Sequence, residues 1–506
     1  MRKLFLIYWL CPLFWLIGCS DFLEPKSSDE YIPENATSLD EMLVEEVYTG
    51  LVANSFMFQF HNFFDDDITV TDLSIGFREH EQAQADAIFA LYTLQSDMFV
   101  KMSLYGSGVT GLAWDEYYET ILGCNVALDY LEKVNDAEEM ERYVAAQALA
   151  LRAFNYFQLV NLFGAPYNYN PDALGVPLKL KSGLTTDWMK RNTVGEVYGQ
   201  ICKDLAQSDS LFRLLPPAKQ FNQDFRINLP AVRFLRSRVN LYMENYEETI
   251  RWADSVLLWK EFQLYDLQMF TPSTDVAKPY YGNYTTGEVI WSYGSAADIT
   301  RLARLQAYDK NNKRYYLFNA SPELLNSYPE EDSLRKKLYI FEEYSNYVWT
   351  GNKRAVGKVP NNASLNIQYG TDFGMSLRLS ELYLNLAEAH AMLGNGERAL
   401  YYLNELRRKR IKEYKDVTEL SGEALIQFVK EERRRELCFE GHRWFDLRRW
   451  GMESFTRKWK LYDEPWQYYV IEKNDPAFTL PIPEKVIEQN PGLEQNPLAP
   501  ERHEAL

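Results

Sequence analysis

Two stretches of this sequence repeat one plan: an amphipathic helix, a tight turn and a second amphipathic helix. The first stretch lies between 230 and 259 and turns near position 245, and the second turns at 394–396, which read Gly-Asn-Gly. The apolar positions of the second stretch follow the helical period and are Leu379, Leu382, Leu386, Ala389, Leu393, Ala399, Leu403 and Leu406. Pairs of this length are typical of tetratricopeptide repeats, in which each pair buries its apolar face against the next. The pattern therefore predicts an α-solenoid layer.

Four further segments carry the helical period. They cover 38–54, 114–134, 136–164 and 192–211. In the first of them, Ser38 and Glu41 have the spacing of a capping box. The predicted fold is mainly α, with about four two-helix units.

Two other segments lack this period. One is a loop-rich lobe at about 264–366, dense in Gly, Asn, Pro and Tyr, and the other is a shorter loop insertion at 65–111. A long irregular stretch that is rich in aromatic residues is more often a binding surface than a linker. We therefore expect the ligand site of this protein in these segments.

The N-terminus has the parts of a lipoprotein signal peptide: Arg2 and Lys3, an apolar run over 4–17, and Gly18 directly before Cys19. We expect cleavage before Cys19 and acylation of that cysteine, which anchors the chain to a membrane. The alternatives are a plain secretory signal with a chance cysteine, or a signal anchor. The predicted organisation is a signal peptide at 1–18, the lipidated cysteine with a tether at 19–35, and one folded unit at 36–506.

The net charge limits the partners of the chain. Its 54 basic and 72 acidic side chains give a formal charge of −18, and removal of 1–18, which holds Arg2 and Lys3 and no acid, makes it −20. Such a surface repels phosphate backbones and anionic head groups. Nucleic acid and a broad membrane-surface contact are therefore not predicted as partners, whereas neutral ligands are compatible with this charge.

No residue pattern typical of an enzyme or a metal site is found. Asp65, Asp66 and Asp67 are adjacent rather than placed across a cleft, so we interpret them as solvated loop or helix-cap acids. The histidines form no zinc motif; they are His61, His80, His390, His442 and His503. No phosphate-binding glycine loop or nucleophile elbow occurs either. The sequence predicts no catalysis, no metal and no cofactor.

Three cysteines follow Cys19, namely Cys124, Cys202 and Cys438. Their spacing fits neither a metal site nor a redox motif. We predict three buried free thiols, with one disulfide as the alternative.

Four segments, in order along the chain, resemble the SusD/RagB family of outer-membrane lipoproteins. Residues 148–167 (ALALRAFNYFQLVNLFGAPY) resemble the signature helix of the family, and residues 377–410 resemble its last tetratricopeptide pair. Residues 431–451 resemble its motif E-R-R-R-E-L-x-F-E-G-H-R-W-F-D-L-R-R-W-G almost letter for letter, and residues 480–497 resemble its closing L-P-I-P and N-P-x-L-x-Q-N-P segments. Asp21 and Glu24, just behind Cys19, resemble the surface-export signal of the family.

The resemblance implies a SusD-like fold: the tetratricopeptide layer with an irregular, ligand-binding lobe. It also implies a cell-surface, lipid-anchored protein of the outer membrane that binds glycans and passes them to a SusC-like TonB-dependent transporter. Family members bind a nutrient and leave its cleavage to separate enzymes, so the resemblance implies no catalysis.

The arginines of these motifs are interpreted as structural. They alternate with acids, as expected of ion pairs within and between helices; they are Arg152, Arg433, Arg434, Arg435, Arg443, Arg448 and Arg449. His442 and Trp444 are interpreted as packed core residues. The basic cluster at 407–410 is explained by the dipole at a helix C-terminus.

A neutral glycan offers apolar ring faces and many hydroxyls, so its site needs exposed aromatic rings beside polar groups. The family places such residues in the two irregular segments, and this implies candidates by region only. In the insertion they are Phe77, Arg78, His80 and Tyr105, and in the lobe they are Tyr280, Tyr281, Asn283, Tyr284, Trp291, Tyr293, Tyr308 and Trp349. For Trp291 a buried strand residue is at least as well supported, since 289–293 alternate as a strand does. For the cluster at 280–284 ligand contact is favoured over loop packing.

Two other functions stay open at this point. One is the same architecture binding peptide, which needs a cleft suited to extended backbone. The other is an anchored tetratricopeptide scaffold for proteins, which needs helix-lined grooves and no aromatic lobe.

Overall fold

The computed structural model describes residues 33–48, 57–58, 60–105, 113–184, 187–269, 284–295, 305–341, 355–356 and 373–502. Cys19, the tether up to residue 32, and four candidate ligand residues lie outside these ranges. The four candidates are Tyr280, Tyr281, Asn283 and Trp349.

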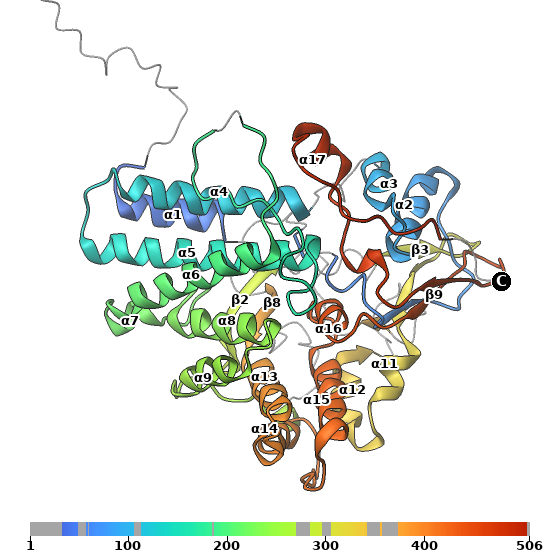
Figure 1. Cartoon of the computed structure of the whole chain (residues 1–506). Coiled ribbons are helices and arrows are strands. Elements are labelled where there is room, and N and C mark those ends of the chain that lie inside the picture. Colours follow the sequence, from blue (N-terminus) through green and yellow to red (C-terminus); the bar gives the residue numbers. More distant parts are fainter. Residues whose placement is uncertain are drawn as a thin grey trace, which may run out of the picture.

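One side of the molecule is a layer of long helices, each packed against the next along the chain (Figure 1). Within it α1 packs on α4 and α5, and α13 touches α8, α9, α14 and α15. The helices are α1 (Ala36–Glu46), α4 (Ala113–Leu131), α5 (Glu138–Phe163), α6 (Val194–Arg213), α8 (Leu229–Tyr242), α9 (Tyr246–Leu257), α13 (Leu379–Met392), α14 (Gly396–Arg408) and α15 (Gly422–Leu437). The predicted mainly α fold is confirmed, and so are the helix pairs α8–α9 and α13–α14.

The helix α5 is the centre of this layer. Every residue from Ala146 to Phe163 is buried, because α4, α6, α8 and α1 cover it. A helix that is covered on all sides needs apolar side chains, or polar side chains with buried partners, on every side. The predicted signature segment, most of which lies in α5, meets this condition. Cys124 and Cys438 are buried free thiols as predicted, whereas the free thiol of Cys202 is only half-buried.

Two local predictions are wrong. The helix α1 is capped by Asn35, whose side chain accepts the backbone N–H of Ser38 at 2.9 Å, so Ser38 is inside the helix rather than its cap. The insertion at 65–111 is not all loop: it contains α2 (Gln82–Tyr92) and α3 (Met98–Tyr105). Alanine-rich 82–92 has high helix propensity, which outweighed the loop-like composition of its surroundings.

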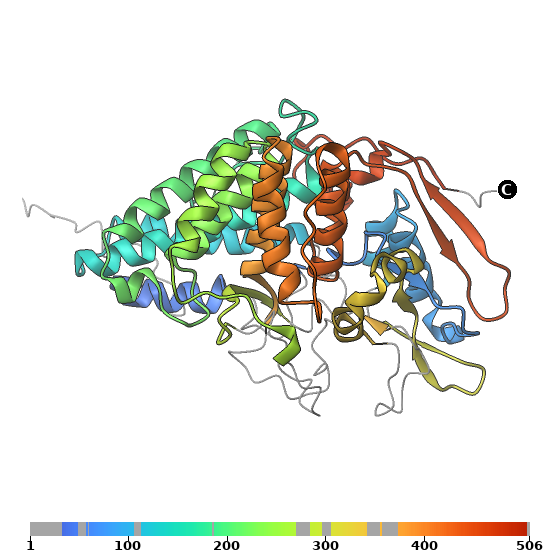
Figure 2. The same cartoon turned by 90° about the horizontal axis from the view of Figure 1, so that it is seen from below.

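The other side of the molecule is built from short helices and two-stranded antiparallel pairs, and the hairpins at 306–316 and 455–471 project away from the helical layer (Figure 2). The strand pairs of this side are β1 (Ile68–Val70) with β5 (Phe318–Ala320), β3 (Gln306–Tyr308) with β4 (Arg314–Tyr316), β6 (Ile340–Phe341) with β7 (Ala355–Val356), and β9 (Phe455–Trp459) with β10 (Gln467–Ile471). A further pair, β2 (Val289–Ser295) with β8 (Phe373–Arg378), lies against α8 and α13 of the helical layer. The pair β1–β5, in which Ile68 lies opposite Ala320, joins the insertion to the lobe.

The remaining helices of this side are α11 (Pro322–Ser327), α12 (Ser333–Tyr339), α16 (Arg443–Arg449) and α17 (Glu484–Gln489). The short α7 (Pro217–Gln220) belongs to the helical layer and packs on α6. Among the described residues, no helix combines the length and apolarity that crossing a membrane requires.

Candidate functional site

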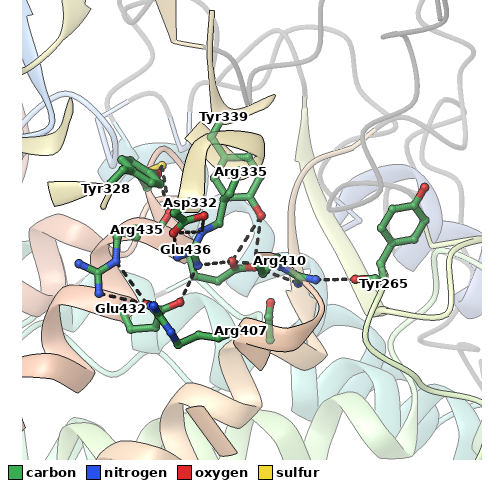
Figure 3. Close-up of polar contacts among 12 residues, drawn as sticks. Tyr265, Tyr328, Asp332, Arg335, Tyr339, Arg407, Arg410, Glu432, Arg435 and Glu436 are labelled. Carbon is green, nitrogen blue, oxygen red and sulfur yellow. Dashed lines mark hydrogen bonds and ion pairs between the residues drawn. The ribbon is translucent and has the colours of Figure 1, made fainter. Parts of the chain in front are cut away.

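A buried ion-pair network lies between α12 and α15 (Figure 3). Glu436 of α15 accepts hydrogen bonds from Arg335 at 3.0 Å, Arg378 at 2.7 Å and Arg410 at 3.0 Å, and none of these side chains is exposed. Glu288 accepts from Arg378 at 2.8 Å and from Arg410 at 2.7 Å. Each buried charge therefore has an opposite partner, which is what makes its burial tolerable.

Ion pairing of the signature arginines is confirmed for most of them. Arg433 donates to Asp446 at 2.8 Å, and Arg152 donates to Asp204 at 2.8 Å. Arg448 differs, because it pairs with backbone carbonyls, including that of Phe478 at 2.5 Å, rather than with an acid. Burial without an acid lowers the pKa of Arg448 to about 10.

The explanation of the basic cluster at 407–410 by the helix dipole is wrong for its two buried members. Arg407 donates to Glu432, and Arg410 lies in the network around Glu436. Arg335 belongs to the same network, although no sequence motif singled it out. His442 and Trp444 are buried core residues as predicted.

The interpretation of Asp65, Asp66 and Asp67 as solvated acids is also wrong. Asp65 and Asp67 are buried. Asp66 accepts two hydrogen bonds from Arg443, at 2.6 and 2.9 Å, and Asp67 accepts one from Arg434 at 2.8 Å. The outward arginines of the signature segment thus hold the start of the insertion in place.

These acids differ in their protonation. Burial alone would raise the pKa of Asp66, but the charges of Arg443 and Arg434 more than offset this and lower it. The pKa of Asp65 is raised well above its usual range by burial and then by the charge of Asp67, against a weaker effect of Arg457. We call Asp66, Asp67, Arg434 and Arg443 the insertion clamp.

The clamp leads directly to a half-buried polar and aromatic face. Arg78 lies with its guanidinium carbon 4.2 Å from the centroid of the Tyr308 ring and donates to the Tyr308 hydroxyl at 3.1 Å. Its other partner is the carboxylate of Glu81, and 39% of the Arg78 side chain is exposed. Gly76 and Tyr308 exchange backbone hydrogen bonds at 2.9 and 2.7 Å, which fixes the insertion against the β3–β4 hairpin. Two candidates that are 230 positions apart in the sequence therefore stand in contact.

A third segment completes this face, and the sequence reasoning missed it. Tyr462, in the turn between β9 and β10, donates its hydroxyl to the carbonyl of Phe77 at 2.6 Å. Its ring lies so close to Gly76 that a Cβ atom there would be 2.4 Å from Tyr462 Cε2. Asp463, next to it, accepts from Ser74 at 2.6 Å and pairs with Lys310. The glycine at position 76, followed by the aromatic residue at 77, was the only sequence signal that another ring could approach the backbone here. We call Arg78, His80, Tyr308 and Tyr462 the Arg78 face.

Three sequence candidates lose their proposed role. Trp291 and Tyr293 of β2 are buried, because β8 pairs with this strand and Phe154 of α5 packs on both rings at 5.1 and 4.8 Å. The indole N–H of Trp291 is already used by the carbonyl of Phe225 at 3.0 Å. Phe77 is buried under the face rather than exposed on it.

The other described candidates are placed as follows. His80 is exposed beside Arg78, and Tyr284 is half-buried with its ring edge on Phe373 at 6.1 Å. Tyr105 ends α3. In the described part of the chain, no group of three His, Cys, Asp or Glu side chains is arranged to hold a metal ion.

Two family models match the chain and together span most of it. The model described as "SusD family" matches residues 270–498, and the model described as "Starch-binding associating with outer membrane" matches residues 21–241. Two curated proteins from Formosa agariphila are similar over about two thirds of the chain. SusD-like protein P38 is 24% identical over 66% of this chain and 71% of its own length, and SusD-like protein P2 is 26% identical over 68% and 72%.

Solved structures have the same fold along nearly the whole chain. A SusD superfamily protein from Bacteroides vulgatus is 21% identical, with a TM-score of 0.69 over 92% of this chain and 100% of its own. A SusD superfamily protein from Bacteroides thetaiotaomicron is 21% identical, with a TM-score of 0.66 over 91% and 98%. A protein from Bacteroides vulgatus described as a putative sugar binding protein is 24% identical, with a TM-score of 0.65 over 92% and 99%.

Proposed function

The chain belongs to the SusD/RagB family, and from this premise we propose that it binds a glycan on the Arg78 face and delivers it to a SusC-like TonB-dependent transporter. The observation that carries the proposal is the stack of Arg78 on Tyr308 at 4.2 Å, beside the Tyr462 hydroxyl that bonds the neighbouring Phe77 carbonyl. Such a stack offers a flat surface for the apolar face of a sugar, and the guanidinium and phenol edges offer hydrogen bonds to its hydroxyls.

The charges around the face favour an uncharged glycan. Arg78 pairs with Glu81, and Lys310 pairs with Asp463. The hydrogen bond from Arg78 lowers the pKa of Glu81, and the one from Lys310 lowers the pKa of Asp463, so both acids stay ionised at neutral pH. Since the cations are compensated, the face has no surplus positive charge to attract sulfated or acidic sugars.

The signal-peptide pattern ending at Cys19 supports anchoring in the outer membrane by lipid, with the folded unit on the cell surface. One of the matched models is itself described as associating with the outer membrane. We propose that the protein is a binding partner of the transporter and not an enzyme.

The experiment is a binding screen of the protein without residues 1–19 against maltose, xylose, mannose and galactose polysaccharides and their oligosaccharides, with a peptide digest alongside. We expect saturable binding of one neutral glycan class. Replacement Tyr308→Ala should weaken it ~2–10-fold, since one stacked aromatic contributes about 0.5–1.5 kcal/mol. The melting temperature should stay unchanged.

The control is Tyr468→Ala, which removes a tyrosine that is 44% exposed on β10 and outside the face. We expect it to bind as the wild type does. Saturable binding of peptides alone would replace the glycan function by peptide capture, and equal binding by the Tyr308→Ala variant would remove the site from the Arg78 face.

A further inference from the structure

The helices α6, α8 and α9 carry four arginines on a side of the helical layer that is accessible to solvent. The three helices lie side by side, and α8 contacts both of the others (Figure 1). We call these arginines the arginine patch, and they share no residue with the Arg78 face. They are Arg213 of α6, Arg233 and Arg236 of α8, and Arg251 of α9. The two outer members are exposed, and the two on α8 are half-buried.

Three of these arginines share one acid, Asp209 of α6. Its carboxylate oxygens lie 3.0 Å from Arg213 Nε, 3.0 Å from Arg233 Nε and 3.9 Å from Arg236 Nη1. The side chain of Asp209 is almost fully buried, so it holds the arginines together from the inside. A single carboxylate offsets only one of the three positive charges.

Arg236 and Arg251 lie over the ring of Trp252 on α9. Their guanidinium carbons are 3.4 and 4.9 Å from the centroid of this ring. The acid at this end of the patch is Glu248, which accepts hydrogen bonds from Arg251 Nη1 at 3.0 Å and from the indole N–H of Trp252 at 2.9 Å. The ring therefore holds two like charges close together, and one acid again serves more than one donor.

The patch keeps a surplus of positive charge. Within the described residues, its four arginines form ion pairs with Asp209 and Glu248 alone, and the sequence of α8 contains no acid. The other acids of α9, Glu247 and Asp254, make no ion pair with the patch in this part of the chain. Four positive and two negative charges leave a local surplus of two, on a chain whose formal charge is −18.

This surplus affects Arg236 most directly. Burial lowers its pKa and the repulsion from Arg251 adds to this effect, against a partial offset by Asp209. The network around Glu436 has the opposite composition, because its three arginines also pair with Glu288, Asp332 and Glu440 and so meet four acids. A half-buried cation without full compensation is stabilised by a further anion that comes close. The arginine patch is therefore suited to bind negative charge from outside.

The donors of the patch indicate which anion fits. The Nη groups of Arg233 make no hydrogen bond among the described residues, and a guanidinium can donate the two parallel bonds that a carboxylate accepts. Guanidinium groups already lie over the Trp252 ring, which therefore offers no open platform for a sugar. Arginine and tryptophan are enriched in the energetically dominant parts of protein interfaces. These features favour Asp and Glu side chains of a protein over a sulfated or acidic glycan.

We propose that the arginine patch is a docking surface for an acidic segment of a partner protein, whose carboxylates bind Arg233, Arg236 and Arg251. The attraction is electrostatic, so it speeds association and weakens as ionic strength rises. This docking function goes beyond the proposed glycan function and does not depend on it. Because the patch and the Arg78 face have no residue in common, glycan binding should be unaffected by changes in the patch.

The test measures the fluorescence anisotropy of a labelled peptide of alternating glutamate and glycine, titrated at low ionic strength with the protein without residues 1–19. We expect saturable binding that added salt weakens. The variant Arg236→Gln/Arg251→Gln should lose ~10-fold in affinity, since charge-assisted hydrogen bonds disappear. Asp209 keeps Arg213 and Arg233 as partners in this variant, so the melting temperature and the glycan affinity should stay the same.

A second variant should act in the opposite direction. Glu248→Gln removes one of the two acids but keeps an oxygen for the indole N–H of Trp252, so affinity for the acidic peptide should rise ~2–5-fold. A purely structural role of the patch predicts no such gain. The matched control is Arg142→Gln/Arg408→Gln, which removes the same number of charges from arginines outside the patch that pair with acids. We expect this control to bind as the wild type does.

Other results would overturn the proposal. Absence of peptide binding, or equal affinities of the Arg236→Gln/Arg251→Gln variant and the control, would show that the patch does not dock an acidic segment. Binding of heparin alone, lost in the patch variant, would assign the patch to a sulfated glycan, and binding of vesicles with anionic lipids alone would assign it to a membrane. A wild type that sediments as a dimer, beside a monomeric patch variant, would make a second copy of this chain the occupant. A failed glycan screen would overturn the proposed function and leave the docking surface standing.

Discussion

The region around Glu436 and the Arg78 face use the same chemistry in opposite surroundings. Both hold arginines against carboxylates and aromatic hydroxyls. Around Glu436 the arginines are fully buried, whereas 39% of the Arg78 side chain is exposed. The comparison shows that residue type alone does not separate the structural arginines from the one proposed to bind a ligand; burial does.

The difference is also energetic. A buried charge that loses its partner stays buried and uncompensated, so every change in the Glu436 network should cost stability. An exposed charge that loses its partner is solvated by water, so a change on the Arg78 face should cost little stability and affect only what binds there. Variants of the two regions should therefore separate folding from binding.

The largest effect is expected for Glu436→Ala. It leaves the fully buried Arg335, Arg378 and Arg410 with one acid fewer, and breaking such a network costs ~3–5 kcal/mol. Urea unfolding should show this as a fall in the free energy of unfolding at pH 7.

The matched control is Glu453→Ala, which breaks the exposed pair with Lys473. We expect no measurable change in stability from it. If Glu436→Ala were as stable as this control, water would reach the network and the contrast between the two regions would fail.

A smaller effect that touches both regions is expected for Asp66→Asn. This change removes the charge that Arg443 holds with two hydrogen bonds, and we expect a loss of ~2–3 kcal/mol. Because the clamp positions the chain that leads to Arg78, glycan affinity should fall as well. The control Asp204→Asn breaks the buried pair with Arg152 in the helical layer, and it should lower stability without changing affinity.

The pH dependence of this variant follows from the lowered pKa of Asp66. In the unfolded chain an aspartate titrates near ~3.9. A depressed pKa in the folded state gives stability that is present above that value and is lost as pH falls below it. The gap between wild type and Asp66→Asn should therefore be full at pH 7 and shrink below pH ~4; a constant gap would show that the lost hydrogen bonds, not the charge, carry the effect.

The helical layer was predictable because its evidence is local. The period of apolar residues placed α8–α9 and α13–α14, and the continuous small and apolar run of 148–167 indicated the buried α5. The clamp was not predictable, since Asp66 and Arg443 are 377 positions apart and adjacent acids are usually solvated.

The Arg78 face was predictable only in its parts. Arg78 and Tyr308 were both candidates by region, but their contact depends on the pairing of β1 with β5, which no local pattern indicates. The alternation at 289–293 correctly indicated a strand, yet both faces of β2 are covered, so Trp291 and Tyr293 are core residues. Tyr462 had no signal of its own.

A further prediction concerns His61, because a buried side chain should affect the stability of the protein. His61 is buried against Phe58 and Phe445, and burial, with a smaller effect of Arg238, lowers its pKa to about 3. In the unfolded chain it takes up a proton near pH ~6.5, so its contribution is present above that pH and is lost as pH falls toward 3. The free energy of unfolding should drop by ~1 kcal/mol between pH 6.5 and 5.5. The variant His61→Gln should be less stable at pH 7 but lack this slope; an unchanged slope would place the titration on another group.

The smallest effect on stability is expected for Arg78→Lys. Lysine keeps the positive charge near Glu81 but loses the planar group that lies 4.2 Å from the Tyr308 ring, so the melting temperature should stay the same while glycan affinity falls ~3–10-fold. Measuring the glycan affinity of Arg78→Lys and Arg78→Ala by calorimetry distinguishes the effect of the positive charge from that of the planar guanidinium. Equal losses would assign the role to the planar stack, and a loss confined to Arg78→Ala would assign it to the charge. If neither variant loses affinity, Arg78 packs beside Tyr308 without taking part in binding. Its ion pair would then have only a structural role, like the buried ion pairs around Glu436, and the contrast between the two regions would fail.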